Sequence, residues 1–149
     1  MAYKKKTWAE KMNPHTQWKV EVTTRKFADV PEGCKLLIAT PTIVEDYMRK
    51  IPEGRHVTIP QMRADLAKEY GADMTCPVTS GIFVRIVAEN AYEQMKQGAP
   101  LEKIAPFWRM IDLKSSQARK LTFGTNFLLK QRAAEGLPEV QAKTVKATT

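Results

Sequence analysis

The sequence predicts an α+β fold built around a winged helix-turn-helix, and three observations lead to this prediction. Two stretches, 58–71 and 79–96, carry apolar residues at helical spacing and are separated by a short turn. The segment 18–22 alternates apolar and polar residues, as a half-buried strand does. The segments 104–111 and 119–121, with a polar turn between them, predict two strands that would form the wing.

The N-terminal part, residues 1–40, is predicted to be a short extension of mixed structure. Residues 1–6 form a basic leader, and residues 7–12 predict a helical turn that carries Trp8. After the strand predicted at 18–22, the apolar residues 36–38 predict either a short buried strand or the approach to a helix.

Three helices are predicted between residues 42 and 96. Thr42 and Glu45 have the spacing of a capping box and predict a helix up to Ile51. Thr58 and Gln61 repeat this spacing, and Gly71 then stops the next helix. In the third helix the apolar residues occupy one side, whereas the opposite side carries Arg85, Glu89, Tyr92 and Lys96.

The C-terminal third contains the predicted wing, a last helix and a tail. Lys114, Ser115 and Ser116 are predicted to form the polar tip of the wing. Residues 125–135 again have helical spacing, with Gly136 as the stop. Residues 137–149 lack apolar periodicity and predict a flexible tail.

The composition favours a small globular protein with a polyanionic partner. The chain has 149 residues, 43% hydrophobic and 27% charged, which suits one domain. Its formal net charge of +8 favours nucleic acid among partners. The sequence lacks an apolar run long enough for a membrane span, so we expect a cytoplasmic protein, associated with the nucleoid if the source is bacterial. Cys34 and Cys76 lack a CxxC spacing, and no metal or cofactor is expected.

Residues 41–136 resemble the DNA-binding domain of the alkylguanine-DNA alkyltransferases (methylated-DNA–protein-cysteine methyltransferases). The similarity is greater to the alkyltransferase-like proteins, the branch without the reactive cysteine. It rests on short motifs in the family's order and spacing, namely 51–54, Val57, Thr58, Arg85, 106–109 and 134–136.

The resemblance implies a protein that binds damaged DNA without repairing it. Phe107 stands at the position of the family's cysteine and Trp108 at that of its histidine. A benzyl side chain cannot act as a nucleophile, so alkyl transfer at this position is excluded. We therefore expect a non-enzymatic sensor of alkylated or otherwise damaged bases, with double-stranded DNA as its partner, alkylated guanine as a candidate lesion, and downstream DNA repair proteins acting after it.

Each candidate site residue has two interpretations. Arg85 matches the family's arginine finger, which fills the space of an extruded base, but it also suits a surface pair with Glu89. Phe107, Trp108 and Arg109 would form the base pocket, although adjacent aromatic residues also suit a core. Five further cations suit either phosphate contacts or a solvated surface: Arg63, Lys68, Lys114, Arg119 and Lys120.

Two other functions stay open on the sequence. One is a thiol-dependent transferase that uses Cys76, which lies at the start of a predicted helix where the helix dipole can favour a thiolate. The other is an interaction module that kept the fold without binding DNA.

Overall fold

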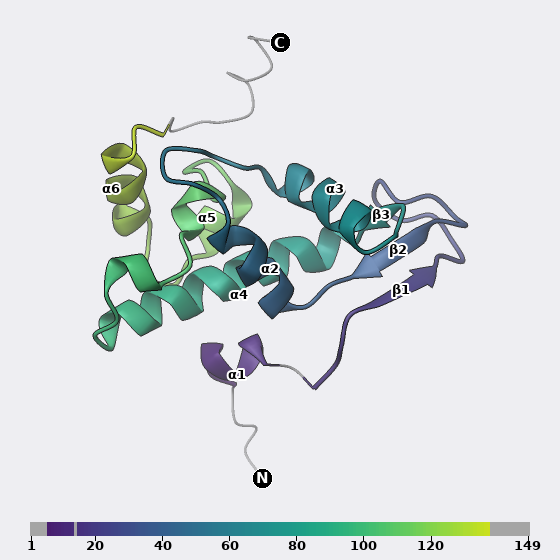
Figure 1. Ribbon diagram of the computed structural model, residues 1–149, viewed down its shortest axis with the longest axis horizontal. Coiled ribbons are helices and arrows are strands. Elements are labelled where there is room, and N and C mark those ends of the chain that lie inside the picture. The colour runs from purple at the N-terminus through teal and green to yellow at the C-terminus, as the bar shows by residue number, and fades with distance from the viewer. Residues whose placement is uncertain (1–5, 14, 138–149) are drawn as a thin grey trace.

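The computed structural model describes residues 6–13 and 15–137 and has an α+β fold, as predicted (Figure 1). A long helix, α4, runs through the middle of the molecule, with α1 and α2 packed against it. A small three-stranded sheet and α3 lie at one end, and α6 lies at the other. The elements are α1 (Trp8–Met12), β1 (Lys19–Val22), β2 (Lys35–Ile38), α2 (Pro41–Arg49), α3 (Ile59–Glu69), β3 (Met74–Thr75), α4 (Pro77–Lys96), the 3-10 helices η1 (Leu101–Lys103) and η2 (Phe107–Arg109), α5 (Ser116–Lys120) and α6 (Asn126–Ala134).

The sheet joins the N-terminal residues to the helix pair. Its strand order is β1-β2-β3, with β1 antiparallel to β2 and β2 parallel to β3. Because β3 lies in the turn between α3 and α4, Leu36 and Leu37 of β2 pair directly with the segment that joins these two helices. The strand predicted at 18–22 is confirmed as β1, but all four of its residues are exposed rather than half-buried.

The helix pair forms as the sequence predicts. Thr58 caps α3 by accepting a hydrogen bond at Oγ1 from Gln61 N (3.1 Å), which satisfies one free N–H of the first turn. Gly71 follows α3 with φ +70°, a conformation that glycine adopts without strain. In α2, by contrast, the predicted Thr42 cap is wrong, because Thr40 Oγ1 accepts from Ile43 N and the helix begins at Pro41.

The two strands predicted for the wing are not present; residues 107–109 form a 3-10 helix and residues 119–120 end a short α-helix. Ser115 Oγ accepts a hydrogen bond from Ala118 N (3.1 Å) and thereby starts α5, so the residues predicted as a hairpin tip are a helix N-cap. Ala118 is buried, and α5 packs on α4. In the other segment, residues 107–109 form η2, and Phe107 and Trp108 enter the core.

The main core surrounds α4. It joins the buried faces of α2, α3 and α4 to the residues of η2 and α6. A second, small cluster lies at the sheet end and contains Val30, Cys34, Leu36 and Cys76. Of the tail predicted at 137–149, the structure describes only Leu137, which is buried in the main core; residues 138–149 lie outside the described residues.

Candidate functional site

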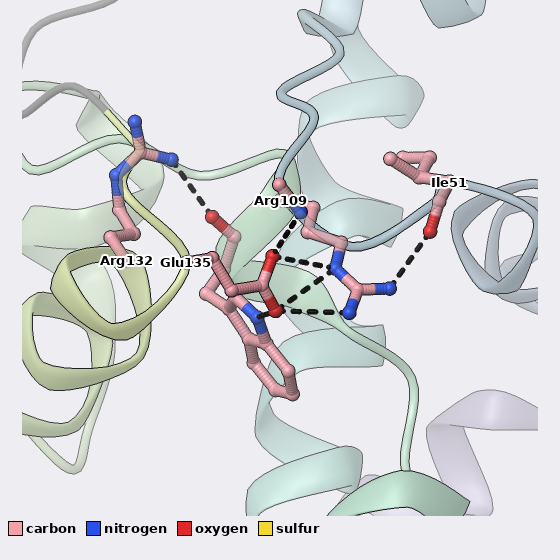
Figure 2. Close-up of polar contacts among 6 residues, drawn as sticks. Ile51, Arg109, Arg132 and Glu135 are labelled. Carbon is pink, nitrogen blue, oxygen red and sulfur yellow. Dashed lines mark hydrogen bonds and ion pairs between the residues drawn. The ribbon is translucent and has the colours of Figure 1, made fainter.

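Glu135, at the end of α6, joins two distant segments of the chain to that helix. Its Oε2 accepts hydrogen bonds from Trp108 Nε1 (2.6 Å) and from Arg109 Nη2 (2.9 Å). Its Oε1 accepts from Gly54 N (2.9 Å). Arg109 in turn donates from Nη1 to the carbonyl oxygen of Ile51 (2.8 Å), and Figure 2 shows Glu135 and Ile51 on opposite sides of this guanidinium. The motifs at 51–54, 106–109 and 134–136, which carry the resemblance, therefore meet at one point.

The carboxylate of Glu135 is held in its charged form. Burial acts to raise its pKa, but hydrogen bonds from Arg109, Gly54 and Trp108 outweigh burial and keep the pKa below its ordinary value. The ion pair with Arg109 is largely shielded from water on both sides. Glu135 is thus an ionised anchor at neutral pH.

Arg132 of α6 also binds the segment that contains Trp108, through backbone carbonyl groups. It is buried, and its Nη1 donates to the carbonyl oxygens of Trp108 (2.8 Å) and Ile111 (3.3 Å). The same nitrogen lies 2.9 Å from His56 Nδ1. Burial, followed by the positive charge of Arg132, lowers the pKa of His56 to about 4, so the imidazole is neutral at pH 7 and accepts this hydrogen bond.

The base pocket predicted from Phe107, Trp108 and Arg109 is only partly at the surface. Phe107 is fully buried, and its ring packs against Trp108 and Phe123 with ring centroids 5.4 and 5.8 Å apart. A base therefore has no access to the face of Phe107 in this structure. Trp108 and Arg109 do line a surface pocket of about 390 Å³ beside Glu135.

A separate groove of about 510 Å³ follows the first half of α4, between α1 and α5. Val78 and Ile82, one helical turn apart, are 56% and 52% exposed in it. The described residues that line it include three cations, Lys11, Arg85 and Lys120, and no carboxylate. The groove combines exposed apolar side chains with cations, and its cations come from three helices.

Arg85 is partly held by its neighbours. Its guanidinium carbon lies 5.3 Å from the ring centroid of Trp8, and its Nε lies 3.7 Å from Glu89 Oε2. Glu89 is itself buried, where it accepts hydrogen bonds from the backbone N (2.7 Å) and the hydroxyl (2.6 Å) of Thr122. The side of α4 opposite its predicted apolar stripe is therefore partly covered. Tyr92 on the same side stacks on Phe123 with a centroid distance of 3.9 Å.

The other predicted cations do not form one surface. Arg63 is engaged, since Nη1 and Nη2 each lie 3.0 Å from a carboxylate oxygen of Asp29 and Nε donates to the carbonyl oxygen of Thr75. The hydrogen bond from Arg63 lowers the pKa of Asp29. Lys68 is exposed on α3. Lys114 and Arg119 are exposed and do not line the groove, and Arg119 Nη1 donates to the carbonyl oxygen of Lys114 (3.0 Å).

Cys76 lies at the start of α4 but inside the protein. It is 5% exposed and packs in the cluster with Cys34 and Leu36. Both cysteines are free thiols. A nucleophilic thiol must be accessible to its substrate, and this one is covered.

Sequence reasoning missed several residues of both regions. Lys11 lines the groove together with Arg85, but the two residues are far apart in the sequence. No pattern in the sequence indicates that they belong to one surface. Arg132 and His56 are joined across 76 positions of sequence. For Glu135, the only signal was its place in the motif that ends α6.

Among the residues that the structure describes, no group of His, Cys, Asp and Glu side chains is arranged to hold a metal ion. Within the same residues, no helix has the length and apolar character of a membrane span. Comparison of the chain with protein-family models, with curated proteins and with solved structures finds no match.

Proposed function

We propose that the protein binds double-stranded DNA through the groove on the first half of α4. The observation that carries this proposal is the combination of exposed Val78 and Ile82 with three cations, and no carboxylate, among the described residues that line the groove. The α3–α4 pair is the helix-turn-helix. In place of the predicted wing, α5 supplies the second contact with the DNA.

The two kinds of side chain suit two parts of a duplex. Lys11 and Lys120, on opposite sides of the groove, suit contacts with phosphates, which position a protein without reading sequence. Apolar side chains between such cations suit the floor of the minor groove, where proteins insert them between base steps. A net charge of +8 adds a long-range attraction for the polyanion.

The resemblance to the alkyltransferase-like proteins extends the proposal from binding to inspection of bases. Arg85 is the candidate for the residue that enters the duplex, and this step requires it to leave Trp8 and Glu89. Phe107 takes the place of a nucleophile, and Cys76 is buried, so we propose no alkyl transfer. The two aromatic side chains of η2 act in the core, not as a stacking surface for the base.

The binding test is fluorescence anisotropy with a labelled duplex across a salt series. Affinity should fall steeply with salt, because bound phosphates release their counterions. Lys11→Gln and Lys120→Gln should each weaken binding and make the salt slope shallower by about one unit. Lys130→Gln, an exposed change on α6, is the matched control. Equal losses in all three variants would refute the groove as the binding surface.

The inspection test compares matched duplexes with and without O6-methylguanine. Arg85→Ala should weaken binding to the lesion duplex more than binding to the intact duplex, because unstacking costs least at a damaged base. Lys120→Gln should weaken both alike. The intact mass of the protein should stay unchanged after incubation with the lesion duplex. A stoichiometric mass gain of one methyl group would replace this proposal with a transferase, and mapping the methyl group to Cys76 would identify the nucleophile.

A further inference from the structure

The outer strand of the sheet, β1, presents an apolar row at an open edge. Val20 and Val22 alternate along β1 and therefore lie on one face, and Trp18 directly precedes the strand; their exposed fractions are 36%, 61% and 47%. Trp18 is oriented by Tyr70, whose ring it meets edge to face at a centroid distance of 4.7 Å. In the described sheet, β1 has a neighbouring strand on one side only.

The backbone of β1 shows which groups face outward. Thr23 N donates to the carbonyl oxygen of Cys34 (2.9 Å), so the groups of Thr23 point toward β2. In an antiparallel ladder this direction alternates along the strand. The N–H and C=O groups of Lys19 and Glu21 therefore also face β2, and those of Val20 and Val22 face the open edge.

We propose that β1 pairs with β1 of a second copy of this chain, antiparallel and with a two-fold axis at Val20. In this register Val20 of each copy exchanges both backbone hydrogen bonds with Val20 of the other. Trp18 lies opposite Val22 of the second copy. The apolar row then continues across both strands as aromatic and β-branched pairs, which favour strand pairing.

In this register each charged side chain of β1 lies opposite a side chain of opposite charge in the second copy. The neighbouring registers do not give this match. Lys19 lies opposite Glu21 of the second copy, and Glu21 opposite Lys19, in the type of pair where side chains approach most closely. Within one copy the two side chains already meet, with Lys19 Nζ 3.0 Å from Glu21 Oε1. A shift of the axis to Val22 would place Lys19 opposite Arg25. A shift by one residue would place Val20 opposite Glu21 and bury a charge beside the apolar row.

The pairing covers about five residues of each chain, so the dimer is a weak one. Interfaces well below the usual size give weak, transient association. We expect a dissociation constant of about 10–100 μM for the dimer, which is weak for a protein–protein complex. The inference does not depend on the proposed binding of DNA.

The test is sedimentation equilibrium of the full chain without DNA, from about 1 μM to 1 mM, a range that brackets the expected constant. The native protein should pass from monomer to dimer. Val20→Pro should remain monomeric across the range, because proline removes the central outward N–H while edge strands tolerate it. Circular dichroism matched to the native protein checks that the variant is folded.

A charge exchange identifies the register. Lys19→Glu and Glu21→Lys should each be monomeric alone, because each places like charges opposite one another in its own dimer. Mixed together at equal concentration, they should form a heterodimer, since every charge then meets its opposite. Within each variant chain the two side chains still repel, so only contacts between chains can produce this rescue. A native protein that stays monomeric at 1 mM, or a dimer that these variants and their mixture do not alter, would overturn the proposal.

Discussion

Glu135 holds the end of α6 against two distant segments of the chain. One carboxylate accepts hydrogen bonds from Gly54, Trp108 and Arg109, which belong to two segments distant from α6. Breaking one partner of such a shielded pair leaves the other charge without compensation, which costs more than the pair contributes. The arrangement fixes η2 against α6 and so orders the core beneath the helix pair.

Glu135→Gln should therefore lower the free energy of unfolding by about 2–4 kcal/mol. The amide keeps the shape of the carboxylate but presents an N–H group to a cation and removes the charge that Arg109 requires. Urea unfolding measures the change. Glu32→Gln, an exposed control, should shift stability by less than about 0.5 kcal/mol. Equal small effects in both variants would show that Glu135 is not an anchor.

His56 makes the same region sensitive to acid. The pKa of His56 is about 4 in the folded protein, against 6.5 for an ordinary imidazole. Between pH 4 and pH 6.5 the unfolded chain therefore binds more protons than the folded protein. The free energy of unfolding must then fall as the pH falls from about 6.5 toward 4, and this contribution is constant above 6.5. The pKa of Glu135 is also lowered, so its contribution is lost below its ordinary value of 4.5.

His56→Asn should flatten the pH dependence of stability in that window. The asparagine Oδ1 can accept the hydrogen bond from Arg132 as His56 Nδ1 does, but it does not titrate. Urea midpoints of both proteins at pH 7.5, 5.5 and 4.5 supply the comparison. The native protein should lose more stability between the first and last pH than the variant does. Parallel losses would mean that other groups set the acid sensitivity.

At the scale of elements, α4 must accommodate α5 closely while presenting its first half to solvent. At Gly81 of α4, an added Cβ would lie 2.8 Å from Gln117 Nε2 of α5. That atom is the end of a flexible side chain and can rotate away. The packing therefore does not require glycine at position 81, and the glycine lowers the stability of α4.

Gly81→Ala should raise the free energy of unfolding by about 0.5–1 kcal/mol, since alanine is the better residue in a helix interior. The matched control is Gly71→Ala after α3, where φ is +70° and an added Cβ is strained, and it should lower stability by about 1 kcal/mol. Thermal unfolding of both variants measures the two signs. A destabilised Gly81→Ala would mean that Gln117 has no room to move.

At the scale of the whole molecule, the sequence predicts local elements well and long-range contacts poorly. The cap at Thr58 and the stop at Gly71 depend on neighbouring residues and are confirmed. The prediction of a wing is wrong because a serine before a short basic stretch suits a turn between strands and a helix N-cap equally. Packing of α5 on α4 decides between the two. The hydrogen bonds of Glu135 and the lining of the groove bring together residues that are far apart in the sequence. Hydrophobic periodicity relates only neighbouring residues, so it cannot predict such contacts.

The central claim is that the first half of α4, with α1 and α5, is the surface that meets DNA. The most direct measurement is a ¹⁵N–¹H NMR titration of the protein with a short duplex, which reports every backbone amide separately. If this surface binds DNA, the shifts should be concentrated at residues 78–85, at Lys11 and at residues 117–120. Shifts confined to α6 or to the sheet, or no shifts at a duplex concentration of about 1 mM, would contradict it, because non-specific DNA binding is already tighter than that.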